Sequence, residues 1–419
     1  MKWSESSLGE LVAQDGGIIQ TGPFGSQLHQ ADYEANGIPV IMPKDIIDGR
    51  VALDGVARVS EETAQRLGRH RLKERALVLP RRGEITKRAF ITIEQAGWLC
   101  GTGCLKIELN GEYLLPEFLY YYMEQARVVR WLEQHAVGTT MLNLNTEIVA
   151  GLPVRYPIPT IQQRIADILS AYDDLIENNR RRMALLEEAA RQLYREWFVR
   201  LRFPGHEHTR ITHGVPEGWE HQLLAKACLP ENGIQTGPFG SQLHQSDYTE
   251  EGVPVVMPKD IINFRISVDD IARIPESLAD SLGRHRMQEG DVVYGRRGDI
   301  GRRGFISRRQ AGWLCGTGSL RLRPNQDVVV PRYFFEALGA PDTAGTIAAR
   351  AKGATMPNLN ATIMASVPLL VPPRALQRQY AENVEPMFAM VETLADQNQK
   401  LRASRALLLP RLMSGEIAV

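Results

Sequence analysis

Two stretches of the sequence gather basic side chains that could bind anions or planar hydrogen-bond acceptors. Residues 69–88 hold eight Arg or Lys against two Glu, and residues 284–309 hold eight Arg against three acidic residues. Such clusters can neutralise phosphates, and an arginine can donate two parallel hydrogen bonds to a guanine edge. A solvated charged surface is the alternative interpretation. The basic candidates for contact with a nucleic acid, which include one lysine upstream of each stretch, are Lys44, Arg69, Arg71, Arg81, Arg82, Lys87, Arg88, Lys259, Arg284, Arg286, Arg296, Arg297, Arg302 and Arg303.

Polar, glycine-rich loops flank both basic stretches. Amide side chains can make paired hydrogen bonds to adenine, and glycines let the backbone approach a ligand closely. Loops and helix starts capped by Asn or Thr are the alternative interpretation of the same residues. The polar candidates are Gln20, Thr21, Ser26, Thr140 and Asn143, with Gln235, Thr236, Ser241, Thr355 and Asn358 as their counterparts later in the chain.

The sequence lacks the patterns of the common catalytic sites. It contains no phosphate-binding G-x-x-x-x-G-K-S/T loop, no Asp/Asn-Pro-Pro-Tyr/Phe motif of adenine methyltransferases, no H-E-x-x-H and no G-x-S-x-G. The histidines are scattered, and His70 and His285 stand between arginines, a poor setting for metal ligands. We therefore predict a non-catalytic binding protein that has no metal and no cofactor of its own.

Composition is that of an ordinary globular protein, with 43% hydrophobic residues, 23% charged residues and a net charge of zero. No apolar run approaches the roughly 18 residues that span a bilayer, and the first residues lack a signal-peptide pattern. We expect a cytoplasmic protein with no membrane partner. The cysteines Cys100, Cys104, Cys228 and Cys315 are predicted to be buried thiols, because Ser319 replaces the counterpart of Cys104.

The dominant feature of the sequence is an internal repeat with a constant offset of 215 residues. Residues 20–45 and 235–260 are identical at 20 of 26 positions, and QAGWLCGTG at 95–103 recurs unchanged at 310–318. Each copy is far longer than a solenoid repeat, so each should contain a domain of its own.

Each repeat begins with short β-type runs separated by Gly and Pro. IPVIMP, RALVLP, RAFITI and LKIEL in the first copy are matched by VPVVMP, DVVYGRR and GFIS in the second. These runs predict mostly β domains with many turns. One helix is expected over residues 116–132, with Pro116 at its start.

Each repeat ends in a long helix with a heptad pattern. Residues 161–198 contain no Pro or Gly, and apolar residues recur every seven positions there and in the second copy. A single amphipathic helix would lie on a core, but two matched helices favour an antiparallel coiled coil, which Pro386 would kink or restart. Asn179 and Asn398 interrupt the two patterns at nearly symmetric positions. We predict that the two amides meet in the coil and fix its register.

The order of domains and helices resembles the specificity (S) subunit of type I restriction-modification systems. The similar motifs are TGPFGS at 21–26 and 236–241, RRGEITKRAF and RRGDIGRRGF, the L-N-x-x-x-I segments at 144–153 and 359–368, PEGW at 216–219, YREWFVRLRFPGHE at 194–207, and LLLPRLMSGEI at 407–417. The resemblance covers essentially the whole chain.

The resemblance implies an α+β fold with two tandem, mixed β-rich target recognition domains. Each is followed by a long helix, and the two helices pair as an antiparallel coiled coil with pseudo-twofold symmetry. The expected division is a first recognition domain at 1–157, a central helix at 158–203, a second recognition domain at 204–372 and a C-terminal helix at 373–419.

The family's activity would then belong to a complex rather than to this chain. The resemblance implies that each recognition domain binds one half of a bipartite double-stranded DNA site, and that the helices dock two methyltransferase subunits. Those partners would methylate adenine with S-adenosylmethionine, and motor-nuclease subunits can join them. The family commonly has dissimilar recognition domains, whereas these are close copies, so we expect a target that is an interrupted palindrome or nearly so. A 38-residue helix is about 57 Å long at ~1.5 Å per residue, which places the half-sites on the order of one DNA turn or more apart.

Two other functions fit the same sequence. One is the recognition subunit of a related system whose methylase and nuclease are fused in a single partner. The other is a tandem protein-interaction scaffold that does not bind DNA, for which substitution of Arg81, Arg82, Arg296 or Arg297 would have no effect.

Overall fold

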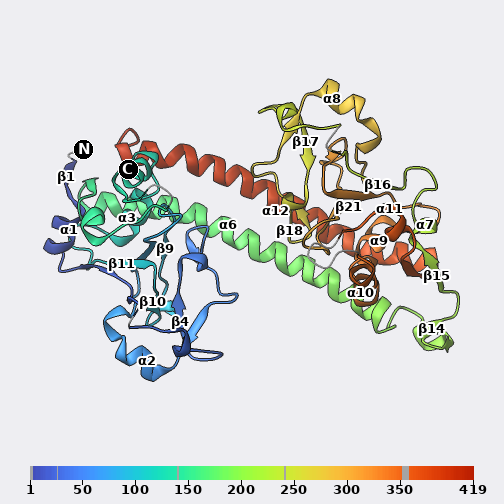
Figure 1. Ribbon diagram of the computed structural model, residues 1–419, viewed down its shortest axis with the longest axis horizontal. Helices are drawn as coiled ribbons and strands as arrows, with labels where there is room; N and C mark the ends of the chain where they lie inside the picture. Colours follow the sequence, from blue (N-terminus) through green and yellow to red (C-terminus); the bar gives the residue numbers. More distant parts are fainter. Residues whose placement is uncertain (1–2, 26, 139–140, 240–241, 352–357) are drawn as a thin grey trace. The chain divides into compact units, whose positions relative to one another are not determined.

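The computed structural model describes residues 3–25, 27–138, 141–239, 242–351 and 358–419. They form two compact units: unit 1 contains residues 1–180 and 395–419, and unit 2 contains residues 181–394. The two long helices, α6 (Pro159–Tyr194) and α12 (Arg374–Ser414), each contribute one part to either unit (Figure 1). The predicted division at 157, 203 and 372 treats each helix as a separate part and does not include this sharing.

Unit 1 contains two four-stranded sheets and two smaller strand pairs. The first sheet has the order β2 (Ile18–Thr21), β11 (Cys104–Glu108), β8 (Leu77–Pro80) and β9 (Ala89–Phe90). The second has the order β10 (Leu99–Cys100), β4 (Ile38–Ile41), β7 (Ala57–Val59) and β3 (Tyr33–Glu34). The pairs are β1 (Ser4–Ser7) with β12 (Pro153–Tyr156), and β5 (Ile46–Ile47) with β6 (Arg50–Val51).

The first sheet separates two apolar cores, which explains why its central strand β8 is apolar on both faces. Leu77 and Leu79 of β8 lie in one core, and Val78 lies in the other. In β11, Leu105 and Cys104 divide in the same way. Because neighbouring side chains of a strand point to opposite faces, burial on both sides favours the uninterrupted apolar run of β8. In β11 the charged residues Lys106 and Glu108 are also buried, and Lys106 Nζ donates to Glu108 Oε1 at 2.7 Å. The predicted strands in RALVLP and LKIEL are confirmed.

The helices of unit 1 before α6 are α1 (Leu8–Gln14), α2 (Glu61–Arg66), α3 (Pro116–Tyr122), α4 (Ala126–His135) and α5 (Thr146–Ala150). The prediction of a single helix over 116–132 is wrong, because the chain turns between α3 and α4. Side chains occupy the carbonyl groups at the end of α3: Arg88 Nε donates to the Tyr120 oxygen at 2.8 Å, and Gln125 Nε2 donates to the Tyr122 oxygen at 3.1 Å. These bonds satisfy acceptors that a longer helix would have used itself.

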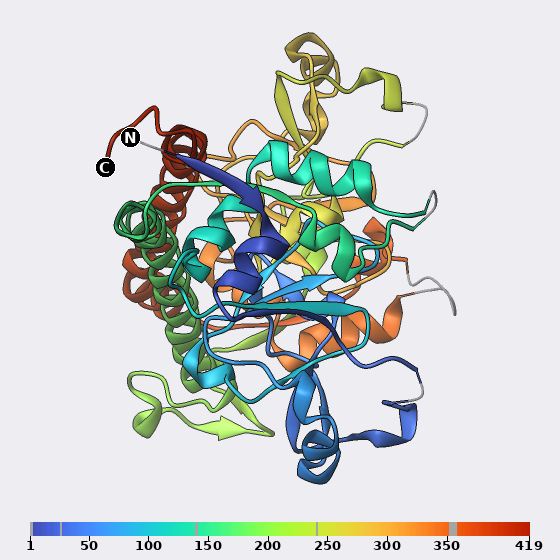
Figure 2. The same ribbon diagram turned by 90° about the vertical axis from the view of Figure 1, so that its left-hand side faces the viewer.

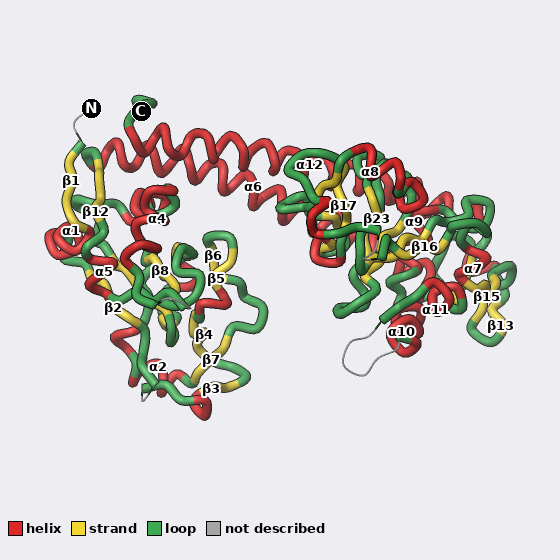
Figure 3. The backbone as a smooth tube through the Cα atoms, turned by 45° about the horizontal axis from the view of Figure 1, so that its top comes forward, coloured by secondary structure: helices red, strands yellow, loops and turns green. Residues whose placement is uncertain are grey.

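In unit 1 the first part of α6 runs antiparallel to the last part of α12 (Figure 3). Ile165 and Leu169 share a core with Leu409 and Leu412, and further along α6 the Asn179 Nδ2 donates to Asn398 Oδ1 at 3.0 Å. Asn398 Nδ2 donates in turn to the Ile176 carbonyl oxygen at 3.1 Å. The two amides therefore meet, as their symmetric positions predict; that they fix the register stays a prediction. The start of β1 also lies beside the end of α12, where Trp3 contacts Gly415 (Figure 2).

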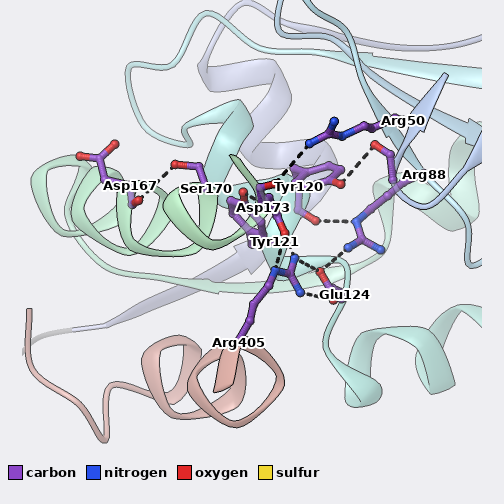
Figure 4. Close-up of polar contacts among 10 residues, drawn as sticks. Arg50, Arg88, Tyr120, Tyr121, Glu124, Asp167, Ser170, Asp173 and Arg405 are labelled. Atoms are coloured by element: carbon purple, nitrogen blue, oxygen red, sulfur yellow. Dashed lines mark hydrogen bonds and ion pairs between the residues drawn. The ribbon is translucent and has the colours of Figure 1, made fainter. Parts of the chain in front are cut away.

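A half-buried polar cluster ties the β-rich domain of unit 1 to both helices (Figure 4). Arg405 of α12 donates to both carboxylate oxygens of Glu124 at 2.6 and 2.7 Å, and its Nε lies 2.7 Å from Asp173 Oδ1 on α6. Arg88 Nη2 donates to Glu124 at 2.6 Å, and the Tyr121 hydroxyl donates to Asp173 at 2.9 Å. Each carboxylate thus has at least two donors, which offsets the cost of burying the charges.

The cluster makes the stability of unit 1 depend on pH. Burial acts to raise the pKa of Glu124, but the hydrogen bonds and charges of Arg405 and Arg88 outweigh it and lower the pKa below its ordinary value of 4.5. A carboxyl group whose pKa is lowered by folding stabilises the fold above its ordinary pKa and loses that contribution as the pH falls through the folded value. We therefore expect Glu124→Gln to be less stable than the wild type at neutral pH, with the difference shrinking below about pH 4.5. Urea unfolding of both proteins across a pH series measures it, and a difference that does not change with pH would contradict it.

Unit 2 repeats the β-rich fold of unit 1. Its four-stranded sheet has the order β16 (Ile234–Thr236), β24 (Ser319–Leu322), β21 (Val292–Gly295) and β22 (Arg303–Phe305). Its three-stranded sheet has the order β20 (Arg273–Ile274), β17 (Val253–Val256) and β23 (Leu314–Cys315). The strand pairs are β15 (Glu220–Leu223) with β25 (Pro368–Val371), β18 (Ile261–Ile262) with β19 (Arg265–Ile266), and β13 (Ile211–Thr212) with β14 (Val215–Pro216). Its shorter helices are α7 (Leu224–Ala227), α8 (Glu276–Ser281), α9 (Pro331–Ala337), α10 (Pro341–Arg350) and α11 (Ala361–Ala365). The predicted strands of the second repeat are confirmed.

In unit 2 the helices exchange roles, because the last part of α6 packs on the first part of α12. The Tyr380 hydroxyl donates to the Ala190 carbonyl oxygen at 3.1 Å, and Met183 packs with Val391 and Leu394. The α-helical pattern of α6 ends at Tyr194 and continues as a π-helix, Arg195–Val199. α12 continues without interruption through Pro386.

The four cysteines are free and buried, which confirms the predicted buried thiols. Burial raises the pKa of the Cys100, Cys228 and Cys315 thiols to about 12, so these thiols are not reactive near neutral pH.

Candidate nucleic-acid interface

The glycine-rich motif at 21–26 is the loop that leaves β2, and its position depends on a close backbone contact. A Cβ at Gly22 would collide with the Gly101 carbonyl oxygen, and one at Gly237 would collide with that of Gly316. TGPFGS and CGTG therefore recur together because they form the two sides of one contact in each repeat. Ser26 and Ser241, which we predicted as contact residues, lie outside the described residues.

An exposed phenylalanine stands in each of these loops. Phe24 is 52% exposed and Phe239 is 53% exposed. Their backbone N–H groups donate to the side-chain oxygens of Gln27 and Gln242 at 3.2 and 3.4 Å, which holds the loops in the same conformation. A fixed, exposed ring offers a flat apolar surface to a base or to a thymine methyl group.

The paired arginines of each RRG motif follow a central strand and pack beside these rings. The Arg81 guanidinium lies 5.0 Å from the centre of the Phe24 ring, and that of Arg296 lies 5.5 Å from the Phe239 ring. The backbone oxygen of Arg81 accepts a hydrogen bond from Leu144 at 2.8 Å. The glycine that follows the arginines has a φ of +77° at Gly83, a conformation that favours glycine.

No carboxylate among the described residues forms an ion pair with Arg81, Arg82, Arg296 or Arg297. Burial lowers the pKa of Arg81 and Arg296, and the adjacent arginines Arg82 and Arg297 lower it further, but a guanidinium remains charged. Arg296 Nε lies 3.4 Å from Asn358 Oδ1, whereas Arg81 Nε and Asn143 Oδ1 are buried with no hydrogen-bond partner among the described residues. Uncompensated positive charge of this kind favours an anionic ligand.

The first basic residue of each stretch is held by a buried histidine. In the 3-10 helix η3 (Gly68–His70), Arg69 Nε donates to His70 Nε2 at 3.0 Å, and in η9 (Gly283–His285) Arg284 and His285 have the same geometry at 3.0 Å. Gln20 Nε2 lies 3.5 Å from His70 Nδ1. Thr21 and Thr236 end the adjacent strands, and the Thr236 carbonyl oxygen accepts from Gln235 Nε2 at 3.1 Å.

Other predicted basic residues are occupied within the fold. Arg71 and Arg286 form ion pairs with Glu61 and Glu276 at 2.6 Å. Arg88 pairs with Glu124 in the half-buried polar cluster of unit 1, and Arg303 Nε donates to the Phe335 carbonyl oxygen at 3.1 Å. The remaining four are exposed or half-buried and contact nearby acceptors: Lys44 with the Gly55 oxygen, Lys87 with Glu84, Lys259 with the Asp270 oxygen, and Arg302 with Asp299.

The structure therefore brings together a smaller set of residues than we predicted. In each repeat the glycine-rich loop connects the Arg-His pair to the RRG arginines and to Asn143 or Asn358. We call these two sets of residues the arginine surfaces: Gln20, Thr21, Phe24, Arg69, His70, Arg81, Arg82 and Asn143, and Gln235, Thr236, Phe239, Arg284, His285, Arg296, Arg297 and Asn358. Thr140 and Thr355 lie outside the described residues.

Comparison with known proteins agrees with this organisation. A family model described as "Type I restriction modification DNA specificity domain" matches residues 2–188, and the second half of the chain repeats the motifs of that segment. Residues 2–188 therefore carry a domain of the type I restriction-modification specificity family. Among curated members, this chain is 22% identical to the type I restriction enzyme MjaIX specificity subunit of Methanocaldococcus jannaschii, over 93% of this chain and 88% of that protein. It is 21% identical to the HindI specificity subunit of Haemophilus influenzae, over 78% of this chain and 83% of that protein.

A solved member of the specificity family has the same fold. The crystal structure of the type I restriction-modification system S subunit from M. genitalium aligns with a TM-score of 0.58 at 15% identity, over 98% of this chain and 96% of that chain. The predicted fold class, two mixed domains combined with long helices, is confirmed. None of the helices in the described part of the chain is long and apolar enough to cross a membrane.

Proposed function

We propose that this chain is the DNA-sequence specificity subunit of a type I restriction-modification complex. Each repeat recognises one half of a bipartite double-stranded target through its arginine surface, and the paired helices dock two methyltransferase subunits, to which motor-nuclease subunits can be added. The observation that carries the proposal is the recurrence of the same uncompensated arginines, exposed phenylalanine and Arg-His pair at an offset of 215 residues. The chain itself supplies recognition, and adenine methylation with S-adenosylmethionine takes place on the partner.

We further propose that the two half-sites are inverted copies or nearly so. All eight residue types of the arginine surface are the same in both repeats. Other residues differ between the repeats, for example Thr86, whose counterpart is Gly301, and Ala89, whose counterpart is Gly304. Substitutions there can alter one base without changing the arrangement of the arginines.

The decisive experiment is single-molecule methylation mapping of DNA from cells that express this chain with its cognate methyltransferase subunit. We expect a split motif whose halves are inverted repeats, with one methylated adenine in each half. Split but unrelated halves would support the specificity function and exclude the symmetry. Absence of any motif, with an active partner present, would exclude the function and favour a protein-interaction scaffold. The domain content of the partner encoded with this chain distinguishes a separate methyltransferase from a fused methylase-nuclease.

A further inference from the structure

The segment LGRHR occurs once in each repeat and contains two arginines in different chemical settings. Carboxylates neutralise the second arginine of each segment. Arg71 forms an ion pair with Glu61 at 2.6 Å. Arg286 forms ion pairs with Glu276 at 2.6 Å and with Asp280 at 2.7 Å. Arg69 and Arg284, two positions earlier, are exposed and have no ion pair among the described residues. Their partner is instead the ring of the next residue, His70 or His285.

The histidine in each pair is almost completely buried, with 2% exposure for His70 and 1% for His285. Its Nε2 accepts a hydrogen bond from the arginine Nε at 3.0 Å in both repeats, so that nitrogen carries no proton. Burial, and then the adjacent arginine charge, lower the pKa of both rings to about 4, although the Thr21 and Thr236 backbones act in the opposite direction. The rings are therefore neutral acceptors at physiological pH.

A neutral acceptor on Nε has a specific effect on an arginine. It fixes the plane of the guanidinium group and leaves the charge uncompensated, whereas a carboxylate would have cancelled it. The two Nη groups remain as a fork, the geometry that donates to O6 and N7 of guanine in the major groove. No described residue accepts a hydrogen bond from the Nη groups of Arg69, and Arg284 Nη2 makes one long contact, 3.3 Å, with Gln242 Oε1.

We propose that His70 and His285 are positioning residues that hold Arg69 and Arg284 for bidentate recognition of one guanine in each half of the target. This inference rests on the proposed function and deepens it. An arginine can bind a phosphate from several orientations, whereas paired hydrogen bonds to a guanine edge require the guanidinium to lie in the plane of the base. The buried, uncharged acceptor repeated at 3.0 Å in both copies therefore favours the base over the backbone.

The test uses the complete complex with the methyltransferase subunits and DNA probes that carry 7-deazaguanine at single positions of one half-site. This base lacks the N7 acceptor but still pairs with cytosine. For the wild type we expect one guanine per half-site whose replacement weakens binding by roughly 5- to 150-fold. Arg69→Lys, which keeps the charge but loses the fork, and His70→Leu, which removes the acceptor, should abolish this discrimination. His70→Gln, which offers an amide oxygen, should restore part of it.

The repeat provides a matched control within the same molecule. Arg69 and His70 variants should leave discrimination in the half-site bound by the other repeat intact, and His285→Leu should do the reverse. A second control is Arg58, whose Nη1 donates to the Gly37 oxygen at 3.0 Å. The variant Arg58→Lys should preserve discrimination in both halves. The inference is overturned if the His70→Leu complex retains guanine discrimination, or if no half-site guanine depends on N7. Failure of the wild-type complex to bind any split target would instead overturn the proposed function.

Discussion

The double variant Arg82→Ala/Arg297→Ala is expected to bind target DNA about 30-fold or more weakly than the wild type, on the basis of at least roughly 1 kcal/mol for each of the two arginine contacts with DNA. Both side chains are exposed, follow a central strand and have no ion pair among the described residues. They lie next to Arg81 and Arg296, whose guanidinium groups are already packed on Phe24 and Phe239. Fluorescence anisotropy with labelled target DNA over a series of salt concentrations measures the effect.

The salt series also separates the two kinds of contact. If Arg82 and Arg297 bind phosphates, the slope of log K against log salt should fall by about 0.9 for each arginine removed. If they bind bases, the slope stays and the loss depends on sequence. Arg195→Ala at the start of the π-helix that follows α6 removes a surface arginine far from this motif in the sequence. It serves as the control and should bind like the wild type. Equal affinity of the double variant and the wild type would leave the scaffold hypothesis as the better account.

Alanine at Arg405 is expected to lower the free energy of unfolding of unit 1 by about 2–3 kcal/mol. Removing one partner of a fully buried ion pair typically costs about 3–5 kcal/mol, because the other charges stay buried without compensation. Glu124 is 29% exposed and Asp173 is 27% exposed, so water screens part of that cost. Lys400→Ala removes an exposed charge from the same helix and should have little effect.

Hydrogen exchange can locate this effect, because the second repeat has uncharged residues at the positions of Arg405, Glu124 and Asp173. The positions that correspond to Arg405, Glu124 and Asp173 at the 215-residue offset are Ala190, Gly339 and Phe388. We therefore expect Arg405→Ala to lower amide protection in α3 (Pro116–Tyr122) and to leave α9 (Pro331–Ala337) unchanged. Equal loss of protection in both helices would mean that the cluster does not act locally.

Most of the fold could be predicted from the repeat and from the period of the apolar residues. The β-type runs became strands because a sheet with a core on each face favours the uninterrupted apolar pattern that Leu77 to Leu79 show. The heptad pattern likewise gave α6 and α12, and the symmetry of the two patterns gave the meeting of Asn179 and Asn398. The break after α3 was missed because it depends on Arg88 and Gln125 side chains that bind its carbonyl groups, which no local pattern reveals.

The arginine surfaces could be predicted only in part, because charge counting does not distinguish a free arginine from a paired one. Arg71 and Arg88 have their carboxylate partners 10 and 36 residues away in the sequence, so the folded chain is needed to find them. Phe24 was missed because it is apolar, and His70 was missed because it was considered only as a metal ligand. A signal for both existed, since each recurs unchanged at the same offset within an otherwise polar motif.

The contact between Trp3 and Gly415 in unit 1 has a covalent counterpart in unit 2. A Cβ at Gly415 would lie 2.6 Å from Trp3 Nε1. In the other repeat, Gly218 corresponds to Trp3 and Arg200 corresponds to Gly415. Residues 201–217, which include the hairpin β13–β14, join these two positions in the chain. The connectivity is therefore that of an almost closed ring with two equivalent places at which it can be opened. A gene rearranged to begin within the codons for 201–217, with a short spacer joining residue 415 to residue 3, would encode the same two units in the opposite order.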